Sequence, residues 1–156
     1  MAKRLVLILY ADFAGALDRI SPLGARSVQS ILPPLKRAVG EGYFTLFSSL
    51  NRNTIDTATA IADGLEKRTP LRTRYSLYSD DWSLYSQFYK EVVARPEDGI
   101  VAVGHKAIVE GFPSFLMERA GEGWRGSIAE ERRCCQGYVY DLAEKTWKLF
   151  PEEFKQ

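Results

Sequence analysis

The sequence contains a single histidine, His105, and only two cysteines, the neighbours Cys134 and Cys135. Because adjacent residues on a strand point to opposite faces, a disulfide between these two would be strained. Two cysteines without a nearby histidine also make a poor metal site. The sequence therefore predicts two reduced thiols and no cofactor.

Long hydrophobic runs and an excess of one charge are also missing. No segment approaches the roughly 20 apolar residues that a membrane-spanning helix needs. The apolar run over residues 5–10 is too short for a signal peptide and is not followed by a small-residue cleavage site. The 21 basic and 20 acidic side chains give a net charge of +1. We therefore expect a cytoplasmic protein with no nucleic-acid and no membrane partner.

What is present is an alternation of strand-like and helix-like segments. The length and a hydrophobic content of 46% fit one domain over residues 1–156. Continuous apolar runs predict buried strands, and apolar residues at helical spacing predict helices. The expected strands are residues 4–10, 43–47, 74–77 and 99–103, and the expected helices are residues 51–65, 81–94 and a fourth that begins near residue 105. This order predicts a three-layer α/β/α fold with a mostly parallel central sheet.

The two ends of the chain carry further structural signals. Residues 11–20 read as a loop, and Ser21 with Pro22 is a good helix start because a hydroxyl cap precedes a proline at the first helical position. That helix runs towards Gly40, and Pro33 with Pro34 should kink or split it. Near the C-terminus, residues 135–141 and 146–150 predict an antiparallel hairpin at one edge of the sheet.

In an open α/β sheet, ligands bind outside the carboxyl ends of the parallel strands. His105 follows directly after a predicted buried strand and precedes a helix, so it lies at such an end. Both a packing role and a chemical role remain open for it. The aromatic segment of residues 78–89 is also open between a core-facing stripe and a ligand or partner surface.

Four stretches resemble the histidine phosphatase superfamily, in family order. Residues 3–12 resemble the family's opening strand, which ends in Arg-His-Gly, and residues 20–26 resemble its Leu-Thr-Pro-Leu-Gly helix start. Residues 48–58 resemble the stretch in which serines precede, and Thr-Ala follows, a phosphate-binding arginine. Residues 101–106 resemble its late strand ending in Gly-His. The resemblance implies a phosphoglycerate mutase-like fold, and the short chain is most similar to small, cap-less phosphohistidine phosphatases.

The departures from this family concern its catalytic groups. The family transfers phosphate through a histidine flanked by arginines, and a second histidine helps to hold the phosphoryl group. Here Tyr10 stands at the nucleophile position, Leu9 and Asn53 stand at the two arginine positions, and only His105 remains. A charge-assisted hydrogen bond is worth roughly 1.5–3 kcal/mol, so losing two arginines would slow the reaction roughly a hundredfold to tens of thousands of times. A phenol is also only about 0.1% ionised at neutral pH.

The resemblance therefore implies a catalytically inactive histidine-phosphatase-like protein, retained for binding a partner protein or a small phosphate-like or phosphorylated ligand. The expected binding residues are Ser48, Ser49, Arg52, Asn53 and Lys106, with Asp80 and Asp81 at the place of the family's acid–base carboxylate. Two alternatives remain. One is a weak or re-purposed phosphatase or phosphotransferase that acts on a phosphomonoester or phosphohistidine through His105. The other is an assembly subunit in which the aromatic segment is buried between chains.

Overall fold

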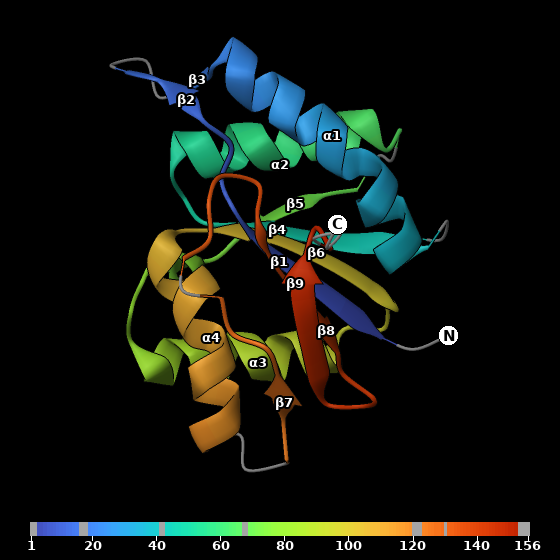
Figure 1. Cartoon of the computed structure of the whole chain (residues 1–156), viewed down its shortest axis with the longest axis vertical. Coiled ribbons are helices and arrows are strands. Elements are labelled where there is room, and N and C mark those ends of the chain that lie inside the picture. The colour runs from blue at the N-terminus through green and yellow to red at the C-terminus, as the bar shows by residue number, and fades with distance from the viewer. Residues whose placement is uncertain are drawn as a thin grey trace.

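A mixed sheet of seven strands lies at the centre of the computed structural model, which describes residues 3–15, 19–40, 43–66, 69–119, 123–129 and 131–152 (Figure 1). Across the sheet the strands follow the order β5-β4-β6-β1-β8-β9-β7. They are β1 (Arg4–Leu9), β4 (Phe44–Ser48), β5 (Leu71–Thr73), β6 (Gly99–Gly104), β7 (Arg125–Gly126), β8 (Gly137–Asp141) and β9 (Thr146–Phe150). The strands β5, β4, β6 and β1 run parallel to their neighbours, and β8 is antiparallel to β1. The predicted, mostly parallel sheet is confirmed.

Helices cover both faces of this sheet. The helices α1 (Pro22–Val39) and α2 (Arg52–Gly64) lie on one face, and α3 (Trp82–Ala94) and α4 (Lys106–Arg119) lie on the other (Figure 1). Along β1, Leu5 and Leu7 enter the core shared with α3 and α4, whereas Val6 and Ile8 enter the core shared with α1 and α2. Burial on both faces explains why this strand is an uninterrupted apolar run. The three-layer α/β/α arrangement is therefore confirmed.

The first helix begins as predicted but is not split. The hydroxyl of Ser21 accepts a hydrogen bond from the backbone N–H of Gly24 at 3.0 Å, and Gly40 ends the helix with a φ of 76°. Pro33 and Pro34 lie inside one continuous helix. Each proline removes a backbone donor, but the buried residues on the inner side of this helix keep it packed on the sheet.

The strand expected at residues 74–77 was placed incorrectly. Tyr75–Leu77 forms a short 3-10 helix, η2, and the strand lies just before it as β5. The β5 strand pairs with the end of β4, and the last bond of this pairing runs from the N–H of Arg74 to the carbonyl of Ser48 at 2.8 Å. A three-residue edge strand with one apolar residue leaves too little pattern for its position to be predicted.

Two smaller differences concern the chain ends. The expected loop over residues 11–20 contains a two-stranded ribbon of β2 (Phe13–Ala14) and β3 (Arg19–Ile20). The predicted C-terminal hairpin is present as β8 and β9, but the short β7 pairs with the outer side of β9. The hairpin therefore lies near the edge of the sheet and is not its outermost element.

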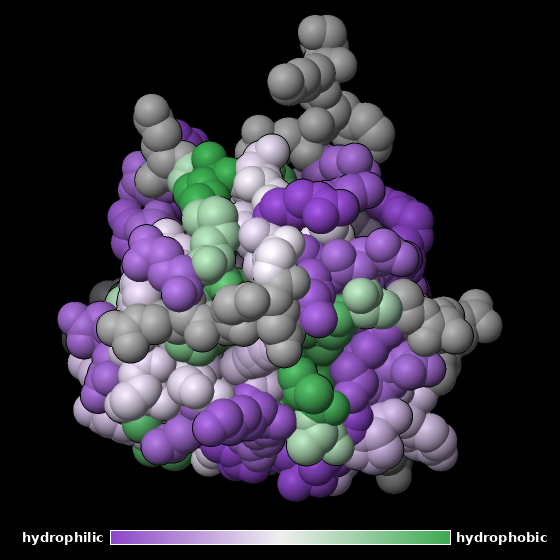
Figure 2. Space-filling model, turned by 90° about the horizontal axis from the view of Figure 1, so that it is seen from below, coloured by the Kyte–Doolittle hydropathy of each residue, from purple (hydrophilic) through white to green (hydrophobic). Residues whose placement is uncertain are grey.

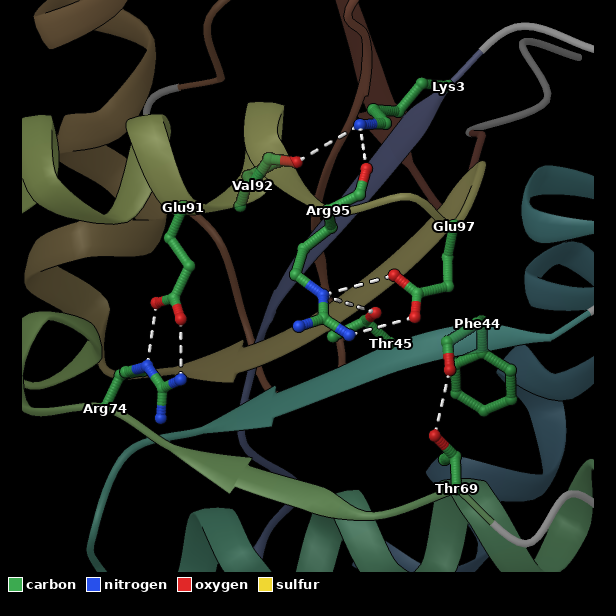
Figure 3. A network of polar contacts seen from close by, with 9 residues as sticks. All are labelled: Lys3, Phe44, Thr45, Thr69, Arg74, Glu91, Val92, Arg95 and Glu97. Carbon is green, nitrogen blue, oxygen red and sulfur yellow. Dashed lines mark hydrogen bonds and ion pairs between the residues drawn. The ribbon is translucent and has the colours of Figure 1, made fainter.

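Polar contacts tie the amino ends of the strands to α3, as Figure 3 shows. The ammonium of Lys3 donates to the carbonyls of Val92, Val93 and Arg95, at the end of α3 where a cation is favourable. Arg95 also pairs with Glu97 at 2.9 Å, and this hydrogen bond lowers the pKa of Glu97 to about 2. These contacts lie at the end of the sheet opposite to the predicted site, so they stabilise the scaffold rather than the site.

None of the helices in the described part of the chain combines the length and the apolar content needed to cross a membrane.

Candidate functional site

The carboxyl ends of three neighbouring parallel strands meet at one end of the sheet. Tyr10 follows β1, His105 follows β6 and Ser49 follows β4, and these strands are adjacent in the order β4-β6-β1. The backbone N–H of Ser49 donates to the carbonyl of Val103 at 3.2 Å, which fixes the start of α2 beside the end of β6. The structure thus brings the predicted residues of β1, β4 and β6 to one edge.

The imidazole of His105 lies between two tyrosine rings. Its ring centroid is 5.3 Å from that of Tyr10 and 4.6 Å from that of Tyr78, both in edge-to-face geometry. The Nε2 atom is buried and has no hydrogen-bond partner among the described residues. Burial lowers the pKa of His105, so the imidazole is neutral at neutral pH. A phosphoryl group could reach Nε2 only if the atoms that cover it moved.

Further aromatic side chains extend this arrangement to the surface. Phe13 contacts Tyr10 at 5.6 Å between ring centroids, and Tyr75 contacts Tyr78 at 6.1 Å. Tyr78 is 48% exposed. We call Phe13, Tyr10, His105, Tyr78 and Tyr75 the aromatic row. The family resemblance predicts cationic side chains around His105, and the structure has aromatic rings there instead.

The sequence analysis did not include Tyr78 among the site residues. It treated the aromatic segment of residues 78–89 as one group, but the structure divides that segment. Tyr85 and Phe88 are buried in the core beside α4, whereas Tyr78 precedes α3 and contacts His105. The sequence offered no separate signal for Tyr78, because it follows the 3-10 helix η2 and not the strand expected at residues 74–77.

Tyr10 is poorly suited to be a nucleophile. Burial is the main cause that raises the pKa of its phenol; the nearby Cys134 thiol also raises it, and Lys106 lowers it. The group is therefore a neutral phenol at neutral pH. Leu9, at the first arginine position, is 6% exposed and belongs to the core beneath α3 and α4.

The predicted anion-binding hydroxyls are used to build the start of α2. Ser48 donates to the carbonyl of Ser49 at 2.8 Å, and the hydroxyl of Ser49 bonds to that of Thr54 at 2.7 Å. The side-chain oxygen of Asn53 accepts from the N–H of Thr54 at 2.8 Å. All four side chains are buried. Arg52, one residue earlier, is exposed and leaves its guanidinium at the surface of the first helical turn.

A buried hydroxyl on α2 fixes the chain directly after Tyr10. Thr57 accepts from the backbone N–H of Ala11 at 3.0 Å and donates to the carbonyl of Asn53 at 2.8 Å. The start of α2 and the end of β1 therefore form one rigid unit. The sequence analysis used Thr57 only to count positions and did not predict this role.

The two carboxylates proposed for acid–base chemistry lie at the start of α3. Asp81 caps this helix by accepting from the N–H of Ser83 at 2.9 Å and from its hydroxyl at 2.8 Å, and these bonds lower the pKa of Asp81. Asp80 is exposed beside it. The capping contact gives Asp81 a structural role at an exposed position.

A loop over residues 131–136 borders the other side of the site. Its Glu131 pairs with Lys106 at 2.9 Å, and the N–H of Cys135 donates to the carbonyl of Leu9 at 2.9 Å. Cys134 is partly buried near Tyr10, and burial followed by the charge of Asp12 raises the pKa of its thiol. Both cysteines are free thiols.

The loop also contains a buried arginine. Arg132 is 2% exposed, its guanidinium lies 5.6 Å from the ring centroid of Tyr138, and it donates to the carbonyl of Phe150 at 3.3 Å. Its backbone N–H also donates to Glu110 at 2.8 Å. Arg132 thus anchors the loop that carries Glu131 and Cys134. Its burial depends on tertiary packing, which charge patterning along the chain does not reveal.

Within the described ranges, no group of three or more histidine, cysteine, aspartate or glutamate side chains is arranged to hold a metal ion.

Substituting Tyr78→Ala is expected to raise the pKa of His105 towards its ordinary value of about 6.5, because the mutation removes one of the rings that bury the imidazole. In the wild type the folded-state pKa lies below the unfolded value, so stability is complete above about pH 6.5 and decreases as the pH falls below it. The Tyr78→Ala variant should lose part of this pH dependence. NMR titration of the imidazole measures the pKa without ambiguity, since the chain has one histidine.

The matched control is Tyr75→Ala. Tyr75 packs against Tyr78, whereas the rings that pack against His105 in the described part of the chain are those of Tyr10 and Tyr78. The Tyr75→Ala variant should shift the pKa less. Equal shifts in the two variants, or none in Tyr78→Ala, would show that Tyr78 does not enclose the imidazole.

The three-layer fold of this chain, with its mostly parallel central sheet, is similar to the fold of solved histidine phosphatases. The chain is similar to the protein histidine phosphatase SixA complexed with tungstate, with a TM-score of 0.69 and 13% identity over 94% of this chain and 93% of that one. The mycobacterial glucosyl-3-phosphoglycerate phosphatase complexed with VO3 gives a TM-score of 0.67 and 13% identity over 99% and 100% of the two chains. Phosphoglycerate mutase from Plasmodium falciparum gives 0.60 and 15% identity over 99% and 91%.

No protein-family model matches the chain, and no curated protein is significantly similar to it in sequence. Identities this low establish the fold alone, because one fold supports many activities. The activity has to be argued from the site.

Proposed function

We propose that this chain is a non-catalytic protein of the histidine phosphatase fold, whose strand-end site binds a phosphate-like anion or a phosphorylated ligand without transferring phosphate. The observation that carries the proposal is the aromatic row. The nucleophile position holds a neutral phenol, and that ring packs against the one histidine of the chain.

Loss of turnover follows from the groups around Tyr10. Leu9 offers no cation to a phosphoryl oxygen, since it belongs to the apolar core. Asn53 uses its oxygen to bond the N–H of Thr54. His105 has its Nε2 atom enclosed. Catalysis of phosphoryl transfer depends mainly on charges positioned to stabilise the transition state. These changes remove most of that stabilisation.

Anion binding is supported by what remains around the row. The helices α2 and α4 both begin at this edge of the sheet, and the first N–H groups of a helix have no partner within the helix. Their dipoles favour negative charge at this place. Arg52 and Lys106 stand in the first turns of the two helices and add positive charge. Two of the similar solved structures hold oxyanions, tungstate in one and VO3 in the other.

A role as an assembly subunit has less support. The aromatic side chains Tyr85 and Phe88 are buried within this chain and are not free to lie between chains. On the side of α3 and α4, Figure 2 shows the hydrophobic side chains of described residues in narrow strips between hydrophilic ones. Surfaces that form permanent interfaces are broader and more continuously apolar.

Titration with tungstate tests the binding half of the proposal. We expect saturable binding to a single site, weakened about fivefold to thirtyfold in the double variant Arg52→Met and Lys106→Met, since two ionic contacts from exposed side chains are lost. Lys90→Met removes an exposed positive charge from α3 and is the matched control, which should bind as the wild type does. Absence of binding, or equal binding by all three proteins, would contradict the proposal.

A further inference from the structure

The positive charge that directly follows His105 in the sequence is already paired. Lys106 directly follows His105, and its ammonium lies 2.9 Å from a carboxylate oxygen of Glu131. The pKa of Lys106 is raised mainly by this hydrogen bond and also by the charges of Glu110 and Glu131. The carboxylate of Glu131 is thus already paired with the ammonium group that an anionic ligand would contact.

The backbone that follows Glu131 is held in place. The next residue, Arg132, bonds through its N–H to Glu110 of α4 at 2.8 Å, and its side chain is buried. Further along, the N–H of Cys135 donates to the carbonyl of Leu9. The loop therefore presents Glu131 to Lys106 at a high effective concentration.

The pair is nevertheless weak enough to be displaced. Lys106 is 54% exposed and Glu131 is 65% exposed at the side chain. The cost of separating an exposed ion pair is small, because water screens both charges. A ligand with two negative charges offsets that cost more readily than a monovalent anion, because its attraction to Lys106 and to the two helix starts is greater.

We infer that Glu131 is a built-in competitor of anionic ligands at Lys106. This inference rests on the proposed function, since it names the residue that regulates access to the same site. Removing the carboxylate leaves Lys106 available, and an oxyanion no longer has to displace a group of the chain.

The test compares tungstate affinities by calorimetric titration. Glu131→Gln should bind tungstate about threefold to fivefold more tightly than the wild type, which corresponds to the worth of an exposed ion pair. Glu144→Gln removes an exposed glutamate from the β8–β9 turn and should leave the affinity unchanged. In the Lys106→Met background, Glu131→Gln should have no effect, because the cation for which it competes is gone.

The carboxyl of Glu131 supplies a second readout. Its pKa is lowered mainly by the hydrogen bond to Lys106, so saturation with tungstate should raise that pKa. An unchanged affinity in Glu131→Gln, or equal tightening with and without Lys106, would overturn the inference while leaving the proposed function in place. If neither the wild type nor Glu131→Gln bound tungstate, both would fail.

Discussion

Replacing Leu9 with arginine is expected to destabilise the protein by at least about 3 kcal/mol, because it places an unpaired charge in an apolar core. Leu9 is 6% exposed and packs in the same cluster as Leu77 and Ile108. Urea unfolding of the Leu9→Arg variant measures the change in free energy. The prediction matters for function, since it says that the arginine expected from the family resemblance cannot be restored by one substitution.

The control for this substitution is Leu9→Met, which keeps the volume and the apolar character of the side chain. It should cost less than about 1.5 kcal/mol. A Leu9→Arg variant as stable as Leu9→Met would show that the side chain at this position reaches the site or solvent. The proposed loss of catalysis would then be reversible at this position.

Replacing Gly137 with alanine is expected to cost about 3 kcal/mol or more. A Cβ atom at this position would lie 1.8 Å from the carbonyl oxygen of Leu7 and 2.8 Å from the Cα of Ile8. Both contacts are with backbone, which cannot rotate away, so the pairing of β8 with β1 would have to open. Thermal or urea unfolding measures the loss.

Gly111 is the matched control, since it is a glycine inside α4. A Cβ atom there would meet only the ring of Tyr85, at 3.6 and 3.7 Å, which is ordinary contact. Alanine is favoured over glycine inside a helix by about 1 kcal/mol, so Gly111→Ala should be neutral or stabilising. If the two substitutions had equal effects, the close approach of β8 to β1 would be wrong.

The central strands could be predicted from the sequence because each is buried on both faces. The segments 5–9 and 100–103 are continuous short apolar runs, which are typical of strands covered on both faces. The edge of the sheet could not be predicted in the same way. β5 is three residues long and only partly buried, and the aromatic residues just after it, at 75–78, gave a stronger strand signal than the strand itself.

The site could be predicted where it depends on position along a strand and not where it depends on packing. Tyr10 and His105 were found because residues after parallel strands meet at one edge. The contact of Tyr78 with His105 depends on the 3-10 turn η2, whose Leu77 carbonyl accepts from the N–H of His105. The burial of Arg132 depends on the ring of Tyr138 beneath it. Neither contact leaves a pattern in the sequence.

Polar residue types also misled the prediction in one respect. Ser48, Ser49 and Asn53 suggested ligand donors, whereas in the structure their side chains hydrogen-bond within the start of α2. Hydroxyl and amide groups serve equally well as helix-start contacts and as ligand contacts, and the sequence does not distinguish the two uses. Arg52 and Lys106 are the predicted residues whose side chains are exposed cations.

The most direct test of the account is the hydrolysis of a generic phosphomonoester, such as p-nitrophenyl phosphate, by the purified wild type and by a His105→Ala variant shown to be folded by circular dichroism. Loss of both arginines and of the nucleophile predicts the same background rate for the two proteins. Turnover by the wild type that His105→Ala abolishes would contradict the account, because it would show that the enclosed imidazole still takes part in phosphoryl transfer.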